Sequence, residues 1–291
     1  MLAAYNLGKK YKREWALKPL TFRLERGMHG LLGPNGAGKS TLMRLLAGLL
    51  VPTSGDALLQ GVSVRNTSYA RSRIGYVPQV FKMYPQLTGR ELLLHTARLV
   101  SQGTRAQQEK DVDRIIHAVH LEDNAFRPVR TYSHGMVKRL GIAQALLGNP
   151  DILIVDEPTT GLDPEERVRL RNLLAELAMR SVVLLSTHIL SDVTSSCKDV
   201  IVLREGELCY KGSLGGLAQC AAGRVWEWQA AQTEWRSMAQ ERLLLAKRTP
   251  DGILCRTLAD ERPTPYAEPA EPTMEDGYLA LIANGQAAFQ L

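Results

Sequence analysis

Residues 33–41 read Gly33-Pro34-Asn35-Gly36-Ala37-Gly38-Lys39-Ser40-Thr41. This stretch follows an apolar run from Met28 to Leu32 and precedes a helical-looking run from Leu42 to Leu50. The pattern G-x-x-x-x-G-K-S/T between a strand and a helix predicts a P-loop, whose glycines let backbone N–H groups turn inward around a phosphate. The N-terminus of the following helix, near Lys39, adds its dipole and free amides to the same site.

Two side chains of the loop have chemistry that suits a nucleotide. The Lys39 ammonium would carry positive charge to the β- and γ-phosphates, and the Ser40 hydroxyl can ligate Mg²⁺. A glycine-rich turn that happens to contain Lys-Ser would explain the same residues without a ligand. The complete pattern, with a strand-like and a helix-like flank, favours the phosphate site.

The composition is that of an ordinary folded protein. Of 291 residues, 45% are hydrophobic and 23% are charged, which suits one large or two modest domains. The net charge of +6 could indicate nucleic acid or an anionic membrane as a partner, but apart from the cluster at 9–13 the basic residues are dispersed. We therefore expect a solvated surface and no nucleic-acid partner.

Cysteines and apolar runs bear on the compartment. The four cysteines form no C-x-x-C pair and are widely spaced, which predicts free thiols in a reducing cytosol: Cys197, Cys209, Cys220 and Cys255. The chain shows neither a secretory signal nor the run of about 18 apolar residues that a membrane helix needs. We expect a cytoplasmic protein, so any chain that spans the membrane would be a separate partner.

Polar side chains follow three runs that are predicted as strands. Asp156 and Glu157 end one apolar run, and Gln79 and His188 each follow another. Ligands of open α/β sheets bind at the carboxyl ends of the strands, so these side chains should surround the P-loop. Asp156 can hold the Mg²⁺ coordination shell, and Glu157 is free to polarise a water. Paired carboxylates can also cap a helix, and a lone histidine is usually a core or surface residue, but the shared sheet edge favours function.

Two further features could contact a nucleotide. Ser133 and Gly135 begin a predicted helix and form a potential phosphate-facing N-terminus, although a serine N-cap explains them without a ligand. Tyr11, in the basic cluster, could stack on a nucleotide base or pack at the rim of the sheet. The residues leave both readings of Tyr11 open.

The rest of the chain predicts how these motifs are organised. Residues 1–32 read as short strands with turns at Gly8 and Gly27, and about 85–150 reads as a helical insertion between strands, with Thr88 and Asp111 as possible helix caps. After about residue 215 the composition changes, and three of the four tryptophans lie there. This tail is expected to contain a strand at 225–228, a helix over 233–246, an irregular proline-rich segment at 263–272 and a helix from Met274 to Ala283.

In this order, the motifs resemble those of ATP-binding-cassette (ABC) ATPase subunits over about residues 1–214. The P-loop matches the family's Walker A motif, and Asp156-Glu157 matches the end of Walker B with its catalytic glutamate. Further matches are Gln79 (Q-loop), Ser133-His134-Gly135-Met136 (signature), Gly161-Leu162-Asp163 (D-loop), His188 (switch histidine) and Tyr11 (adenine-stacking aromatic).

The resemblance implies an α/β fold: a P-loop NTPase core with an antiparallel β-subdomain and a helical insertion over 1–214, and a small C-terminal α+β domain over 215–291. It implies that ATP and Mg²⁺ bind between two copies in a head-to-tail homodimer. One copy would supply Tyr11 and the P-loop, and the other would supply Ser133, Gly135 and Asp163.

The resemblance also assigns catalytic roles. Glu157 would act as the base toward an attacking water, Lys39 and His188 would hold the γ-phosphate, and Gln79 would contact Mg²⁺ or water. Ser40, Gln79 and Asp156 would be the residues at the metal.

The signature departs from the family's usual Leu-Ser-Gly-Gly-Gln. Here it is Tyr132-Ser133-His134-Gly135-Met136, which keeps the serine and the second glycine but loses the contact of the final glutamine. Such variants resemble bacterial exporter ATPases that work with a separate permease chain at the cytoplasmic face of the membrane, and 272–279 resembles the closing helix of that group. The alternatives are a soluble ABC ATPase of DNA repair or translation, and a nucleotide-binding regulator that hydrolyses nothing.

Overall fold

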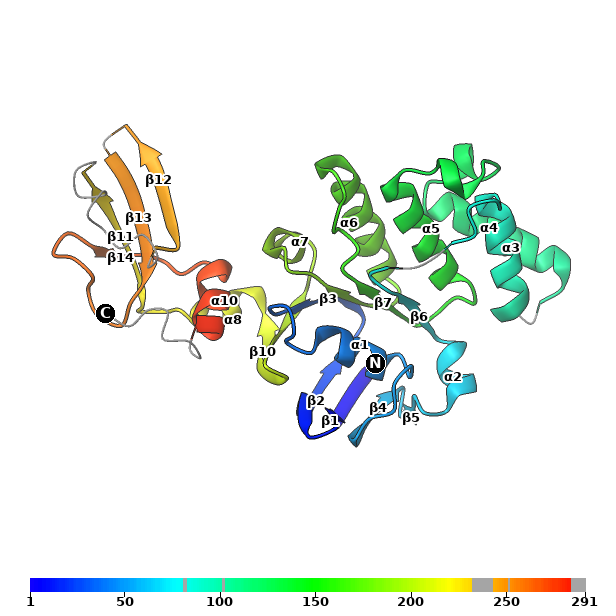
Figure 1. Cartoon of the computed structure of the whole chain (residues 1–291), viewed down its shortest axis with the longest axis horizontal. Coiled ribbons are helices and arrows are strands. Elements are labelled where there is room, and N and C mark those ends of the chain that lie inside the picture. The colour runs from blue at the N-terminus through cyan, green and yellow to red at the C-terminus, as the bar shows by residue number, and fades with distance from the viewer. Residues whose placement is uncertain (81–82, 101–102, 232–242, 251, 284–291) are drawn as a thin grey trace. The chain divides into compact units, whose positions relative to one another are not determined.

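The structure is a computed structural model that describes residues 1–80, 83–100, 103–231, 243–250 and 252–283. Contacts between residues divide the chain into two compact units, Met1–Leu208 and Cys209–Leu291. The division falls six residues before the boundary expected at 214. Figure 1 labels the elements of both units.

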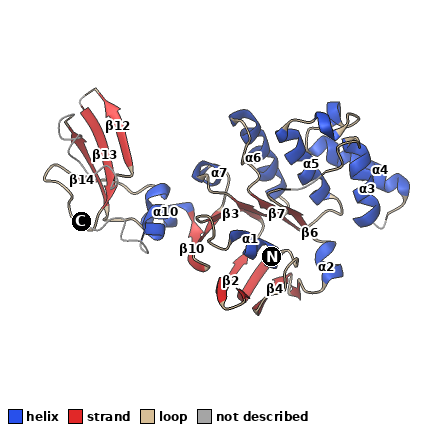
Figure 2. Ribbon diagram, in the orientation of Figure 1, coloured by secondary structure: helices blue, strands red, loops and turns tan. Residues whose placement is uncertain are grey.

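Parallel strands form the centre of the first unit. The six-stranded sheet contains β3 (Gly27–Leu32), β6 (Ile74–Val77), β7 (Ile152–Asp156), β8 (Val182–Ser186), β9 (Asp199–Arg204) and β10 (Glu207–Ser213). Its order is β10-β9-β3-β8-β7-β6, and the pairs from β9 to β6 are parallel (Figure 2). Every residue of β7 and β8 is buried, which explains why both appear in the sequence as continuous apolar runs.

The register of this sheet brings three strand ends to one level. Ser186, the last residue of β8, pairs with Asp156 of β7 on one side and with Leu31 of β3 on the other. The segments that follow these strands therefore leave the sheet side by side, at its carboxyl edge. This is the edge at which open α/β sheets bind ligands.

An antiparallel sheet packs below the parallel one. It contains β1 (Leu2–Tyr11), β2 (Glu14–Leu24), β4 (Ser54–Leu59) and β5 (Val62–Ser63), in the order β2-β1-β4-β5. Helix α1 (Lys39–Leu46) lies between the two sheets, and its leucines join side chains of both in one buried cluster. The expected turn at Gly8 is wrong, because Gly8 lies inside β1 opposite Ser54. Glycine is needed there for close approach, since a Cβ would lie 2.7 Å from the Ser54 Oγ.

Helices occupy the segment between β6 and β7, as the sequence indicates. They are α3 (Gly89–Val100), α4 (Arg105–Ala118) and α5 (His134–Leu146), with short 3-10 turns at Glu122–Asn124 and Val129–Thr131, whereas the short α2 (Thr67–Arg71) precedes β6. Thr88 caps α3, because its Oγ1 accepts from Glu91 N while Glu91 Oε2 accepts from Thr88 N. The second expected cap is wrong: Thr104 caps α4, and Asp111 lies inside that helix.

Two helices cover the face of the parallel sheet that lies opposite α1. They are α6 (Pro164–Ala178), which contacts β3 and β8, and α7 (Leu190–Thr194), which contacts β3 (Figure 1).

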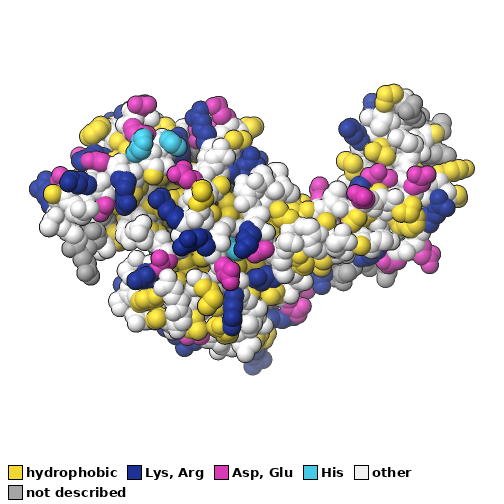
Figure 3. Space-filling view, turned by 180° about the vertical axis from the view of Figure 1, so that it is seen from behind, with side chains coloured by type: hydrophobic (Ala, Val, Ile, Leu, Met, Phe, Trp, Pro, Cys, Tyr) yellow, Lys and Arg dark blue, Asp and Glu magenta, His cyan; other side chains and the backbone are white. Residues whose placement is uncertain are grey.

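On the face of the molecule seen in Figure 3, lysine and arginine side chains are interspersed with acidic ones.

The second unit has its own antiparallel sheet. Strands β11 (Val225–Ala230), β12 (Leu245–Thr249), β13 (Gly252–Leu258) and β14 (Glu268–Pro269) have the order β12-β13-β11-β14, and α8 (Leu214–Gln219) packs against α10 (Met274–Ala283). The last helix was predicted with the same ends. A helix was also expected over 233–246. Most of this range, 233–242, lies outside the described residues. Its last two residues, Leu245 and Ala246, belong to β12, so the predicted helix end is wrong. Among the described residues, no helix has the length and apolar character that crossing a membrane requires.

Candidate functional site

A cleft of about 620 Å³ opens at the carboxyl edge of the parallel sheet. Its walls come from the loop after β3, the start of α1, and the segments after β6, β7 and β8. The lining residues are Ala16, Asn35, Gly36, Ala37, Gly38, Lys39, Ser40, Thr41, Gln79, Glu157 and His188. The structure thus brings the predicted phosphate loop together with the glutamine, glutamate and histidine that follow β6, β7 and β8 of the same sheet.

Two glycines of the loop have steric reasons to be glycine. Gly33 has φ 153° and Gly38 has φ 99°, both in the region that L-residues rarely adopt. A Cβ would lie 2.3 Å from the Leu203 carbonyl oxygen at the first position and 2.6 Å from the Ala16 carbonyl oxygen at the second. The loop is therefore pressed against β2 and β9, which holds its backbone at the floor of the cleft.

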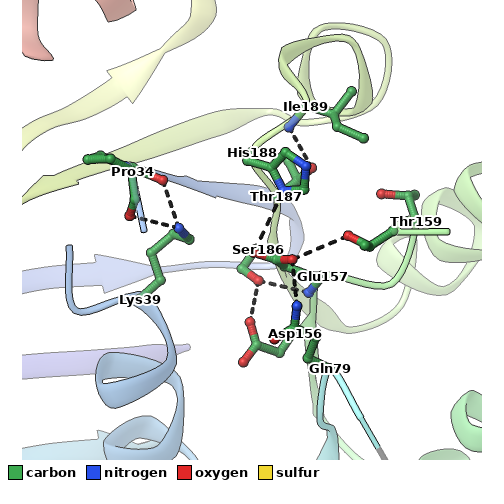
Figure 4. Close-up of polar contacts among 12 residues, drawn as sticks. Pro34, Lys39, Gln79, Asp156, Glu157, Thr159, Ser186, Thr187, His188 and Ile189 are labelled. Carbon is green, nitrogen blue, oxygen red and sulfur yellow. Dashed lines mark hydrogen bonds and ion pairs between the residues drawn. The ribbon is translucent and has the colours of Figure 1, made fainter. Parts of the chain in front are cut away.

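Lys39 lies at the first turn of α1 with its side chain folded over the loop. It is only 7% exposed, and its Nζ donates to the carbonyl oxygens of Gly33 (2.7 Å) and Pro34 (3.1 Å) (Figure 4). Burial lowers the pKa of Lys39, and the nearby carboxylates of Glu157 and Asp156 partly oppose that shift. A phosphate beside this ammonium would favour its charged form and gain a strong charge-assisted contact.

Asp156 and Glu157 face different surroundings although they are adjacent. Asp156 is buried and does not line the cleft, and its Oδ1 accepts from Ser186 Oγ at 2.5 Å. The same Ser186 Oγ accepts from the Glu157 backbone N–H at 2.9 Å. Glu157 has φ 45°, a left-handed conformation that is costly for a residue with a Cβ and is typical of functional sites. Ser186 is thus a site residue that the sequence reading missed.

The Glu157 carboxylate is the point at which the polar groups of the cleft meet. Its Oε2 accepts from Gln79 Nε2 at 2.8 Å and from Thr160 Oγ1 at 3.2 Å. The Nδ1 of His188, an exposed side chain, lies 3.7 Å from Glu157 Oε1. Three strand-end segments therefore converge on one carboxylate (Figure 4).

Lys138 is a second buried lysine of the site that the sequence reading did not single out. It lies in α5, and its Nζ donates to the Gln79 carbonyl oxygen at 2.8 Å. Burial lowers the pKa of Lys138, opposed by the charges of Glu157 and Asp156. It shares this electrostatic environment with Lys39, although 99 residues separate the two in the sequence. Only the packing of α5 beside β6 reveals it.

The predicted signature and D-loop residues lie outside this cleft. Ser133 caps α5, with its Oγ accepting from Met136 N at 3.2 Å, and Asp163 caps α6 in the same way through Glu166 N at 2.8 Å. Gly135 packs against Glu166, since a Cβ there would lie 2.3 Å from its Oε2. The two helix starts therefore lie together, and neither Ser133, Gly135 nor Asp163 lines the cleft of its own chain.

Tyr11 is also absent from the cleft lining. It ends β1 with 48% of its surface exposed, and the Lys9 ammonium lies 5.4 Å from the centre of its ring. Ala16, on the next strand, lines the cleft instead. The stacking role of Tyr11 stays a prediction.

The residues present fit a magnesium ion held together with phosphates. Mg²⁺ prefers oxygen ligands and binds through one or two protein groups plus substrate phosphates rather than through an all-protein cage. Ser40 offers a hydroxyl on the cleft wall, and Asp156 offers a carboxylate at the end of β7. The described residues contain no group of three or more His, Cys, Asp or Glu arranged to hold a metal ion.

A phosphate loop at a helix start, with carboxylates at the end of another parallel strand of the same sheet, defines a P-loop nucleotide-binding protein. The sequence profile of the family described as ABC transporter matches residues 17–160. The chain is 40% identical over 220 residues to the uncharacterized ABC transporter ATP-binding protein YxlF of Bacillus subtilis (strain 168), covering 75% of this chain and 73% of that protein. The chain therefore belongs to the family of ABC transporter ATP-binding subunits, and it is an ATPase.

Two further comparisons agree with this family. The chain is 34% identical over 287 residues to the probable multidrug ABC transporter ATP-binding protein YbhF of Escherichia coli (strain K12), covering 92% of this chain and 49% of that protein. The fold is similar to a solved dimeric structure of an ATP-binding cassette in a post-hydrolysis state, bound to ADP and Pi. That match has a TM-score of 0.66 and 26% identity, and it covers 73% of this chain and 98% of the other.

Proposed function

We propose that this chain powers a membrane exporter by hydrolysing ATP in a head-to-tail homodimer on the cytoplasmic face, with a separate permease as its partner. The observation that carries the proposal is the convergence of Gln79, Glu157 and His188 beside the P-loop in one cleft. A nucleotide whose phosphates enter the loop would have its γ-phosphate directed toward these three side chains.

In the proposed reaction, Glu157 is the general base. It takes a proton from the attacking water, while Gln79 and Thr160 hold its carboxylate by hydrogen bonds to Oε2. His188 approaches the other carboxylate oxygen and steadies the γ-phosphate, and Lys39 supplies positive charge. A bound Mg²⁺, held by Ser40 and Asp156 with Gln79 beside it, would supply charge neutralisation at the β- and γ-phosphates.

The homodimer is proposed because each cleft lacks the predicted signature and D-loop residues. Ser133, Gly135 and Asp163 lie at the starts of α5 and α6, outside the cleft of their own chain. Helix starts present unpaired N–H groups that suit a phosphate, so these residues are placed to contact the nucleotide of a second copy. The related cassette solved in a post-hydrolysis state is also a dimer.

Export is proposed from the variant signature and from the relatives. YbhF carries the name of a probable multidrug transporter subunit, and its match spans both units of this chain. We propose that residues 215–291 form an accessory domain for dimer contacts or regulation. A neighbouring gene for a polytopic membrane protein, with several apolar stretches of about 20 residues, would support a separate permease, and its absence would count against it.

The substitution Glu157→Gln tests the proposed base. Removing a general base typically costs about 10²–10⁴-fold in rate, so kcat should fall by that order while ATP still binds. Steady-state ATPase assays and calorimetric ATP binding measure the two quantities. Glu109→Gln, on α4 away from the cleft, is the matched control and should behave as wild type. Wild-type turnover in Glu157→Gln would show that another group is the base.

A further inference from the structure

A buried carboxylate lies behind the catalytic edge of the sheet and belongs to none of the motifs predicted from the sequence. Asp192, in α7, is 1% exposed. Its Oδ2 accepts two hydrogen bonds, from Thr159 Oγ1 at 2.7 Å and from Thr187 Oγ1 at 3.3 Å. Both threonines are also 1% exposed, so their hydroxyls depend on protein partners. Figure 4 draws both threonines near Glu157 and His188.

The two threonines belong to the two segments that carry the reacting groups. Thr159 follows Glu157 by two residues, and its neighbour Thr160 donates to the Glu157 carboxylate. Thr187 directly precedes His188, and its Oγ1 also accepts from the Ile189 backbone N–H at 2.9 Å. A single carboxylate oxygen therefore connects the turn after β7 with the turn after β8.

Helix α7 itself is anchored, so Asp192 is a fixed point for both turns. Val193 packs on β3 at Gly30, where a Cβ would lie 2.8 Å from its Cγ1. On the other side, Arg171 of α6 donates to the Ser191 carbonyl oxygen (3.3 Å) and to Ser195 Oγ (3.1 Å). The helix is therefore held from β3 and from α6 together.

The geometry at Glu157 requires such support. Its left-handed backbone is unfavourable for a residue with a Cβ and persists only where the surroundings hold it. Within a low-dielectric interior, hydrogen bonds to a carboxylate are strong, and a buried hydroxyl that loses its acceptor is costly. Moving either turn would break a bond to Asp192.

We propose that Asp192 is a positioning residue that sets the separation between Glu157 and His188 by holding Thr159 and Thr187 at once. The proposal rests on the roles of Glu157 and His188 in the proposed function. It concerns the chemical step rather than nucleotide binding, because neither Asp192 nor its two threonines line the cleft.

The test compares hydroxyl-deleting with hydroxyl-keeping variants in the full-length chain. Thr159→Val and Thr187→Val remove one bond each, and Asp192→Ala removes both. Because small misplacements of reacting groups can cost about 10²-fold, we expect kcat to fall about 10-fold for each valine variant and more for Asp192→Ala. The KM for ATP and the affinity for a non-hydrolysable ATP analogue should stay within about twofold of wild type. Thr159→Ser and Thr187→Ser should restore kcat.

A double-mutant cycle provides a second readout that a general loss of stability would not produce. If both threonines act through Asp192, then Asp192→Ala with Thr159→Val should be no slower than Asp192→Ala alone. Thr194→Val is the matched control, because Thr194 is an exposed threonine of the same helix whose Oγ1 donates to the Ser191 carbonyl oxygen (3.2 Å), and it should not change kcat.

The possible outcomes separate this proposal from the proposed function. If thermal unfolding shows that Asp192→Ala does not fold, the comparison of the valine with the serine variants at Thr159 and Thr187 tests the positioning role. Valine variants with wild-type kcat, serine variants that restore nothing, or additive effects in the cycle would overturn the positioning role alone. A wild-type chain that hydrolyses no ATP would overturn the proposed function together with it.

Discussion

Two clefts of similar volume lie in the two units of this chain, and they differ in what their polar groups are bonded to. The cleft beside the P-loop measures about 620 Å³, and a cleft in the second unit measures about 740 Å³. The first lies at the carboxyl ends of parallel strands. The second lies along β11 and β13 of an antiparallel sheet and the segment 266–271.

The pKa values of the cationic side chains in the two clefts are shifted in opposite directions. Lys39 is held mainly by backbone carbonyls, and burial lowers its pKa. Arg256, in the second cleft, donates to Asp276, to Glu227 and to the Glu271 carbonyl oxygen, and its hydrogen bond to Asp276 is the main cause of its raised pKa. Charge in the first cleft is thus available to a ligand, whereas charge in the second is used by the fold. Cleft volume alone does not distinguish these cases.

The largest effect is expected from removing Arg256, which tests whether the ion pairs of the second cleft stabilise the fold. Arg256→Met would leave Asp276, which is 2% exposed, and Glu227 without their cation, and breaking a buried ion pair costs about 3–5 kcal/mol. We expect the second unit to unfold at lower denaturant, followed by tryptophan fluorescence, while ATP hydrolysis changes little. Arg248→Met, at an exposed arginine of β12, is the control. Equal stability of the two variants would mean that the Arg256 pairs are not structural.

The next largest effect is expected where the first cleft would contact the nucleotide base. Stacking of a base on an aromatic ring is worth about 1–3 kcal/mol, so Tyr11→Ala should raise the KM for ATP about 5- to 150-fold if Tyr11 stacks. Trp15→Ala is the sharper comparison, because Trp15 is also exposed and directly precedes Ala16 of the cleft wall. If only Trp15→Ala changes the KM, Tyr11 does not stack on the nucleotide base and instead packs at the rim of the sheet. Initial rates over a range of ATP concentrations measure both.

Much of the first cleft could be predicted because its residues follow strands with strong patterns. The apolar runs before Asp156 and before Thr187 identify β7 and β8, and ligand-binding groups of open sheets lie at strand ends. Of the two predicted helix caps, Thr88 is confirmed, because Glu91 three residues later completes a capping box, whereas Asp111 is wrong, because α4 already begins after Thr104.

The parts that could not be predicted depend on contacts between distant segments. Ser186 bridges Asp156 and the Glu157 backbone only because β7 and β8 pair in one register. Lys138 and Asp192 reach the site from α5 and α7, and no local pattern marks a buried lysine or aspartate in a helix as part of it. Gly8 looks like a turn residue in the sequence, but it lies inside β1, where its close approach to Ser54 of β4 explains the glycine.

The smallest effect tests the electrostatic contrast through pH. Between the lowered pKa of Lys39 and its ordinary value of 10.5, the unfolded chain holds a proton that the folded chain has released, so stability rises with pH. Lys39→Met removes this rise. Without nucleotide, the variant should therefore be more stable than wild type near neutral pH, and the difference should shrink as pH approaches 10.5. Urea unfolding at several pH values measures it, with the exposed Lys247→Met as control. A difference independent of pH would contradict the assignment.

The central claim is that the cleft beside the P-loop is one half of an ATP site that a second copy completes. The most direct test is the molecular mass of Glu157→Gln in solution, measured by light scattering with ATP and with ADP in the presence of Mg²⁺. Because this variant should bind ATP without turning it over, we predict the mass of two chains with ATP and of one chain with ADP. The mass of a single chain with both nucleotides, at concentrations that saturate binding, would contradict the account.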